Sequence, residues 1–221
     1  MNTGKEVEIE QVIKEYVKRF EQEYSGSSIY NECLKDVRGI ELGDITEEEV
    51  EEVIKPFLYE WGRMGRVLGR PKFFHWESEL RKQIQFNCER LEGFRKQDLS
   101  DVDLSEFESD IEKCYESFEK AIGRIAATKV LHLICPNLFP LWDNDIARAV
   151  KNELDRKSEG RNEVDNSSGA DYYRFMQEMQ NLIKEYKGVL SDLANRYKKG
   201  ELKILDECLW WATHRSLSLF L

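Results

Sequence analysis

Metal-ligand motifs and long apolar runs are both missing from this sequence. Its three histidines lie far apart, and neither HExxH nor a CxxC pair occurs, so we expect no metal site and no bound cofactor. The most apolar runs, 130–135 and 216–221, are far shorter than the roughly 20 residues that cross a bilayer. Because the charged N-terminus does not resemble a signal peptide, we expect a cytoplasmic protein with no membrane partner.

Disulfide bonds are not expected either. The sequence has five cysteines, an odd number that does not fit complete pairing, and their spacings are wide and unrelated. We predict that they are buried free thiols, a common environment for cysteine in a helical core. The five are Cys33, Cys88, Cys114, Cys135 and Cys208.

The net charge of −10 is unevenly distributed along the chain. An acidic protein is repelled by phosphate at long range, which disfavours nucleic acid as a partner and favours a protein partner on acidic surfaces. The segment 61–96 is the exception, because it carries nine basic and four acidic residues. The high Glu and Lys content also fits a thermophilic source.

Strand-like alternation is absent, and apolar residues recur at helical spacing along most of the chain. We therefore predict an all-α fold, a compact multi-helix domain over residues 1–221. The alternative is a two-lobed helical protein with a cleft, divided into 1–96 and 97–221. The polar segment 157–169, rich in Ser, Asn and Gly, is predicted to be a mobile surface loop.

Local signals predict where several helices begin and end. Thr46 with Glu49 forms the sequence pattern of a capping box, and Ser105 with Glu108 repeats it. Pro56 is predicted to break or kink the helix that begins at Thr46, with a short helix continuing over 57–61.

The segment 121–150, AIGRIAATKVLHLICPNLFPLWDNDIARAV, has the most distinctive order of parts. Gly123 precedes a helix that carries Lys129, and two prolines then hold an extended path. Asp143 follows directly and opens the next helix. This arrangement of turn, helix, rigid loop and aspartate resembles the helix-hairpin-helix DNA glycosylase superfamily over about 30 of the 221 residues.

The resemblance implies an all-α protein that binds DNA and excises a base. It implies that backbone N–H groups near Gly123 and Arg124 hold a phosphate, and that Asp143 assists departure of a flipped base. Bifunctional members use a lysine amine as nucleophile, and Lys129 is the nearest lysine. This chain departs from the family pattern where Ile125 and Ala126 replace a second glycine, and because Lys129 lies closer to the aspartate in sequence. These departures are consistent with a catalytically degenerate member.

Each of these residues also has a structural interpretation. Asp143 fits an ordinary helix N-cap. Lys129 fits a side chain whose stem covers apolar surface while its charge stays in water, and the alternative is a desolvated and activated amine. Trp142 fits either a ring that stacks on a base or a core residue.

A second group of basic residues lies in the glycine-rich segment 61–72. Arg63, Arg66, Arg70 and Lys72 form the best candidate for an anion or phosphate contact. Three glycines disfavour a regular helix there and allow close approach of the backbone to a ligand. Alternatively, the arginines pair with neighbouring acidic helices. The aromatic segment 73–76 that follows fits either core packing or a stacking platform.

The C-terminal helix is interpreted as a packing helix, although Asp206, Trp210 and His214 lie on its consecutive turns. Three functions from different classes remain open: a DNA-glycosylase-like DNA-binding protein, active or degenerate; a helical protein-interaction module with acidic surfaces; and a helical protein that binds a nucleotide or small anion. Enzymatic activity, the partner and the oligomeric state are left undecided.

Overall fold

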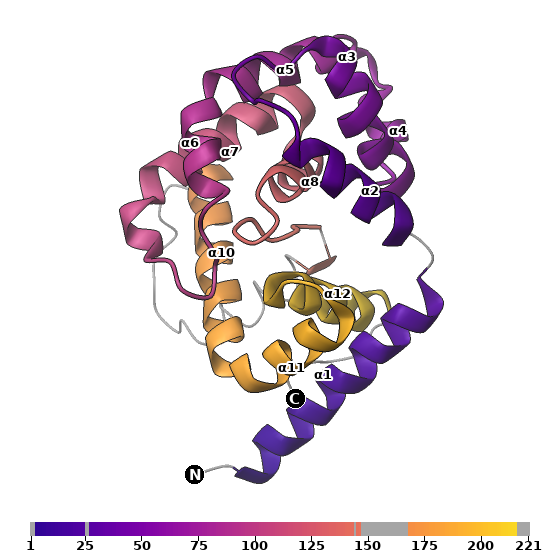
Figure 1. The fold of residues 1–221 in the computed structure, drawn as a ribbon, viewed down its shortest axis with the longest axis vertical. Coiled ribbons are helices and arrows are strands. Elements are labelled where there is room, and N and C mark those ends of the chain that lie inside the picture. Colours follow the sequence, from indigo (N-terminus) through magenta and orange to yellow (C-terminus); the bar gives the residue numbers. More distant parts are fainter. Residues whose placement is uncertain (1–2, 25–26, 144, 147–167, 216–221) are drawn as a thin grey trace.

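The computed structural model describes residues 3–24, 27–143, 145–146 and 168–215. Every regular element in these ranges is a helix, and no strand occurs in them (Figure 1). The predicted all-α fold is therefore confirmed. No helix within the same ranges has both the length and the apolar character that a bilayer crossing requires.

Long helices form both ends of the described chain, and short helical segments connect them in the N-terminal half. The first part contains α1 (Thr3–Glu23), α2 (Ser27–Arg38), α3 (Glu47–Glu49), η1 (Val50–Ile54), η2 (Phe57–Trp61), α4 (Gly65–Leu68), η3 (Pro71–Phe73), α5 (Trp76–Phe86) and α6 (Cys88–Phe94). The second part contains η4 (Leu104–Glu106), α7 (Glu108–Ile122), α8 (Arg124–Ile134), α10 (Ser168–Glu185), α11 (Lys187–Tyr197) and α12 (Glu201–His214).

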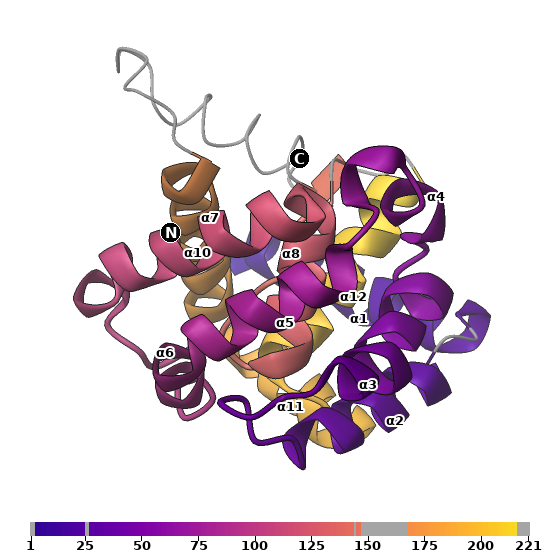
Figure 2. The ribbon, with the colours of Figure 1, turned by 90° about the horizontal axis from the view of Figure 1, so that it is seen from above.

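The helices pack around α8 and α12, which are buried along most of their length. Helices α7, α2 and η2 lie against α8, while α10 lies beside α7 in both views and also contacts α12 (Figure 1, Figure 2). Helix α1 runs along α12 and α11, so the first and last described helices lie side by side (Figure 1). One connected cluster of buried apolar side chains draws on residues before and after position 96.

The capping box predicted at Thr46 is present. The Thr46 hydroxyl accepts a hydrogen bond from the Glu49 N–H at 3.1 Å, and the Glu49 carboxylate accepts one from the Thr46 N–H at 2.8 Å. The predicted break at Pro56 does not occur, because Lys55 and Pro56 both have helical backbone angles and connect the π-helical segments η1 and η2. The predicted short helix at 57–61 is η2.

The capping box predicted at Ser105 is wrong. Asp103 accepts the Ser105 N–H at 3.0 Å and caps the short η4 turn, and α7 begins at Glu108 with no side-chain cap. The predicted loop 157–169 is too long at its end, because α10 begins at Ser168, and its residues 157–167 lie outside the described ranges. All five cysteines are free, with Cys88 half-buried and the other four buried, as predicted.

Candidate functional site

A cavity of about 80 Å³ lies where η2, α8, the segment 141–146 and α12 meet α1. Lys129 and Asp143, both identified from the sequence, line this cavity together. Five aromatic side chains and three charged residues from α12 complete much of the wall. The full lining is Phe20, Tyr24, Trp61, Lys129, Leu141, Trp142, Asp143, Ile146, Lys203, Asp206, Glu207 and Trp210.

The Lys129 amine does not extend into water from its helix. Its Nζ donates a hydrogen bond to the Gly62 carbonyl at 2.5 Å and lies 5.8 Å from the centre of the Trp61 ring. Burial lowers the pKa of Lys129 to about 8, although the nearby Asp143 opposes this shift. A fraction of the amine is therefore neutral near physiological pH, which is the nucleophilic form.

Gly62 makes room for this lysine. A Cβ at position 62 would lie 2.8 Å from the Leu58 carbonyl oxygen and 3.2 Å from Cδ of Lys129, so only glycine leaves the path of the lysine stem free. The close backbone approach that the sequence predicted near Gly62 is thus an approach to Lys129.

Asp143 is a helix N-cap and also a wall of the cavity. Its Oδ1 accepts hydrogen bonds from the N–H groups of Asp145 at 2.9 Å and Ile146 at 2.8 Å. Its Oδ2 forms no hydrogen bond with any described residue, and Asp143 lines the cavity. The capping contacts fix the direction of the carboxylate, because both donors belong to the same turn.

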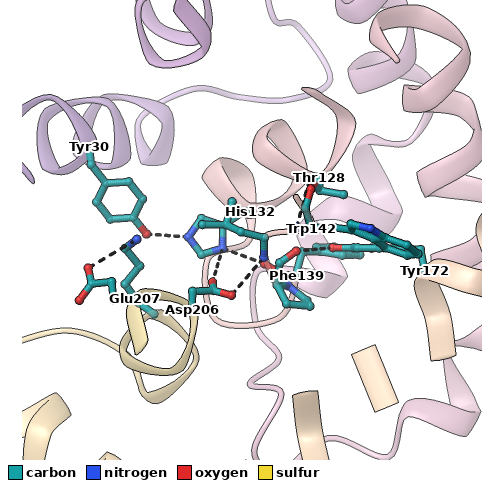
Figure 3. Close-up of polar contacts among 11 residues, drawn as sticks. Tyr30, Thr128, His132, Phe139, Trp142, Tyr172, Asp206 and Glu207 are labelled. Atoms are coloured by element: carbon teal, nitrogen blue, oxygen red, sulfur yellow. Dashed lines mark hydrogen bonds and ion pairs between the residues drawn. The ribbon is translucent and has the colours of Figure 1, made fainter. Parts of the chain in front are cut away.

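The segment before Asp143 is held by buried polar contacts with α8 and α12. The Thr128 hydroxyl lies 3.3 Å from the Trp142 carbonyl oxygen and 3.4 Å from its nitrogen, and Asp206 accepts the Leu141 N–H at 3.3 Å (Figure 3). The Tyr172 hydroxyl donates to the Pro140 carbonyl at 2.8 Å. These contacts position Asp143 relative to Lys129 without using either side chain.

His132 contributes to the same support and is neutral. Its Nδ1 lies 2.7 Å from the Phe139 carbonyl, which can only accept, so Nδ1 carries the proton and Nε2 accepts from the Tyr30 hydroxyl at 2.7 Å (Figure 3). Burial, with Lys203 nearby, lowers the pKa of His132 to about 3. Because both ring nitrogens are occupied, His132 is a structural residue.

Helix α12 supplies a charged wall that the sequence interpretation missed. Lys203, Asp206 and Glu207 are all buried, and Glu207 accepts from Lys199 at 2.7 Å and lies 3.5 Å from the Lys203 amine. Burial raises the pKa of Glu207, while Lys203 and Lys199 oppose the shift. The sequence contains a signal for this charged wall, because three charged residues occur at i, i+3 and i+4 spacing in an otherwise apolar helix.

Trp142 is mainly a core residue. Its ring packs on Tyr172 and Phe175, with centroid separations of 5.6 and 5.1 Å, and it also contributes to the cavity wall. The Arg124 guanidinium lies 5.0 Å from the centre of this ring and 3.7 Å from the Asp171 carboxylate, so it contacts other residues of the protein.

Gly123 shapes the turn between α7 and α8. Its φ of 83° falls in the region that favours glycine, and a Cβ there would lie 3.0 Å from Cζ of Phe73. Its N–H donates to the Glu119 carbonyl at 2.8 Å and ends α7. This N–H is therefore already used, and the expectation that backbone N–H groups here hold a phosphate stays a prediction for the other N–H groups at the start of α8.

The basic residues of segment 61–72 are exposed but do not share one helix. Arg63 has a φ of 54° and precedes α4, which contains only Arg66, while Arg70 follows the helix. No ion pair joins these three arginines to another described residue, so the predicted pairing with acidic helices is not seen in those ranges. Burial raises the pKa of the cavity residue Tyr24, and the charge of Arg63 opposes this shift. Arg63 therefore lies near the cavity.

The aromatic segment after these arginines divides between core and surface. Phe73 and Trp76 are buried, as core packing predicts, and Lys72 lies 4.5 Å from the centre of the Phe73 ring. Phe74 is 79% exposed, so its ring is free to contact a partner.

No protein-family model, curated protein or solved structure matches this chain. The chemistry of the cavity therefore rests on its own residues: an amine with a lowered pKa, an oriented carboxylate, a buried carboxyl group and several aromatic rings.

Proposed function

We propose that this chain is a DNA-glycosylase-like protein that binds a base in the cavity and cleaves its bond to the sugar. The observation that carries this proposal is that Lys129 and Asp143 line one cavity, where burial has lowered the pKa of the lysine to about 8. An amine and a carboxylate on opposite sides of a reacting sugar carbon are the two groups that bifunctional base excision needs.

Each residue has a defined role in the proposed reaction. The neutral form of Lys129 attacks C1′ of the sugar, and at pH 7 roughly one tenth of an amine with a pKa of about 8 is neutral. The negative charge of Asp143 stabilises the positive charge that builds on the sugar as the base departs. The rings of Tyr24, Trp61 and Trp210 provide apolar walls for a planar base.

The exposed arginines support the nucleic-acid part of the proposal. Arg63, Arg66 and Arg70 have no ion-pair partner among the described residues, and Arg63 lies near the cavity residue Tyr24. Phosphate contacts there would offset the repulsion between DNA and a chain of net charge −10. These arginines, which have no ion-pair partner in the part of the chain that the structure describes, also favour a nucleotide or small anion as the second candidate ligand.

The central test measures base release and covalent trapping on duplexes that carry damaged or deaminated bases. Wild-type protein should release a base, and borohydride should reduce the Schiff base to a stable protein–DNA adduct. Lys129→Gln should remove the adduct, and Asp143→Asn should lower base release by about 100-fold or more while preserving the helix cap. Lys120→Gln and Asp36→Asn, both exposed, are the matched controls.

Failure of wild-type protein to release a base or form an adduct on any duplex would exclude the enzymatic function. Adduct formation that persists in Lys129→Gln would instead assign the nucleophile to another amine. Circular dichroism of each variant checks that the helices are intact.

A second test concerns DNA binding by the basic segment. Replacing Arg63, Arg66 and Arg70 together by Ala should abolish binding of short duplexes near physiological salt. The salt dependence of binding should flatten, by about 0.9 in the log–log slope for each phosphate that the variant no longer neutralises. The control replaces Lys35, Lys120 and Lys184, which are equally exposed on other helices. Equal affinity of the two triple variants would remove the arginine segment from the proposed interface.

A further inference from the structure

Two further carboxyl groups, those of Asp206 and Glu207, line the same cavity as Lys129 and Asp143, and Glu207 is paired with Lys199 and Lys203. Asp206 is only 2% exposed, and its Oδ1 accepts the Leu141 N–H at 3.3 Å. Its Oδ2 is buried without a hydrogen-bond partner and lies 4.0 Å from Nδ1 of His132. That nitrogen already donates to Phe139, so it leaves the Asp206 oxygen unpaired.

Burying a charged carboxylate oxygen without a hydrogen-bond donor costs free energy. The neutral carboxylic acid needs fewer hydrogen-bond donors, and its O–H can donate a proton to a ligand. The groups that face Asp206 do not reverse this preference. His132 is neutral, Lys203 is shared with Glu207, and Asp143 is a like charge. Burial raises the pKa of Asp206 well above its ordinary value, with Lys203 and the Leu141 N–H opposing the shift.

The two aspartates of the cavity therefore differ in environment. Asp143 is half-buried, and its Oδ1 accepts hydrogen bonds from two backbone N–H groups. Asp206 is buried and receives one long backbone contact. Carboxyl pairs whose surroundings separate them in this way commonly divide into one charged stabiliser and one acid.

We propose that Asp206 is the general acid of this cavity, which gives its proton to the departing base. This role rests on the proposed function, and it adds a third catalytic residue to Lys129 and Asp143. It also defines the substrate class, since an acid is needed for a neutral base, which would otherwise have to leave as an anion.

The step balances with the groups present. As the C1′–N bond breaks, its electron pair goes to the base nitrogen and the Asp206 proton goes to the base, which departs as a neutral molecule. The neutral Lys129 amine forms the new bond to C1′. The nitrogen then loses one proton to the Asp206 carboxylate, which restores the acid. The sugar ring opens as the C1′–O4′ bond breaks: its electron pair goes to O4′, the nitrogen lone pair forms the C=N bond, and the second nitrogen proton goes to O4′, which leaves the Schiff base and a hydroxyl group.

The test compares two leaving groups in Asp206→Asn. One duplex carries a neutral base, hypoxanthine or uracil, and the other carries N7-methylguanine, which is already cationic and leaves as a neutral molecule without an acid. Asp206→Asn should lower the rate on the neutral base by about 100-fold or more, the usual contribution of a general acid, and change the cationic base less than about 3-fold. Asp36→Asn should change neither rate.

The outcomes separate this inference from the proposed function. If wild-type protein releases no base, the proposed function fails and the assignment of Asp206 fails with it. If wild-type protein releases the neutral base but Asp206→Asn retains its rate, or loses both rates equally, only the acid assignment is overturned. Release of the cationic base alone by wild-type protein also overturns it.

Should Asp206→Asn not fold, the wild-type protein still provides a test. The ratio of the two rates cancels the titration of Lys129 and every other effect of pH that acts on both substrates alike. Because only the neutral base needs the acid, this ratio should fall as pH rises through the ionisation of Asp206. A ratio that does not fall anywhere in the pH range over which the protein stays folded would overturn the assignment.

Discussion

Replacing Lys129 by methionine should raise the free energy of unfolding at pH 7 by about 2 kcal/mol and remove all covalent trapping. The lowered pKa means that the fold holds the charged amine at a cost, about 3 kcal/mol for a shift from 10.5 to about 8. Removal of the hydrogen bond to Gly62 offsets about 1 kcal/mol of this gain. Methionine has nearly the same length and needs no solvation, so the variant should melt at a higher temperature.

The pH dependence of stability checks the physical cause. Because the pKa of Lys129 is lower in the folded than in the unfolded chain, the unfolded chain binds more protons between pH 8 and 10.5, and wild-type stability should rise across that interval. Lys129→Met should lack this rise, and Lys120→Met should keep it. A less stable Lys129→Met variant would show that the lysine supports the fold rather than a reaction.

A more stable Lys129→Met variant would indicate that the cavity has a function. A residue that lowers stability but is held in one position, by a glycine that leaves room for its stem and a carbonyl that accepts its hydrogen bond, has the properties of a functional residue. Asp143 differs, because its capping contacts also stabilise the start of a helix. The two residues therefore need different tests, stability for Lys129 and activity at constant stability for Asp143.

The fold was predictable where local chemistry decides it. Apolar periodicity predicts the helices because each must bury one face, and Thr46 with Glu49 forms a capping box from neighbouring residues alone. Ser105 has the same pattern, but Asp103 lies two residues earlier and takes its N–H first. Competition between nearby acceptors depends on backbone path, which the local sequence pattern does not contain.

The site was predictable only in part for a similar reason. Lys129 and Asp143 stand 14 residues apart in one motif, so sequence order relates them. Asp206 and Glu207 come from a helix more than 60 residues later, and only tertiary packing brings α12 to that cavity. Their charges within an apolar helix were visible, but a single sequence gives no partner for them.

The arginines of segment 61–72 do not share one helix, in agreement with the three glycines that disfavour a regular helix there. Their spacing suggests one helical face, but the positive φ of Arg63 ends the helical path there and the following helix has only four residues. The glycines of the segment correctly indicate close backbone approaches, since Gly62 leaves space for the Lys129 side chain and Gly65 lies against the Tyr59 ring.

His132 should dominate the decrease in stability in acid. Its pKa is about 3 in the folded chain and about 6.5 when unfolded, so the unfolded chain binds the extra proton as pH falls through that interval. This group alone should remove up to about 5 kcal/mol between pH 6.5 and 3. Asp206 has the opposite effect on stability. Because its pKa is raised in the folded chain, the folded chain binds the proton first, and this group stabilises the fold as pH falls.

The comparison variant is His132→Asn, whose amide can still donate to the Phe139 carbonyl but does not titrate. It should be less stable at pH 7 by about 1–3 kcal/mol, because the Tyr30 hydroxyl loses its acceptor. Its stability should nevertheless fall much less steeply below pH 6.5, when urea unfolding is measured at each pH. The exposed His75→Asn should keep the wild-type slope. If stability depended on pH equally in all three proteins, the pKa of His132 would not be lowered by folding. The hydrogen bonds from Tyr30 to His132 and from His132 to the Phe139 carbonyl would then not be what holds the loop that carries Asp143.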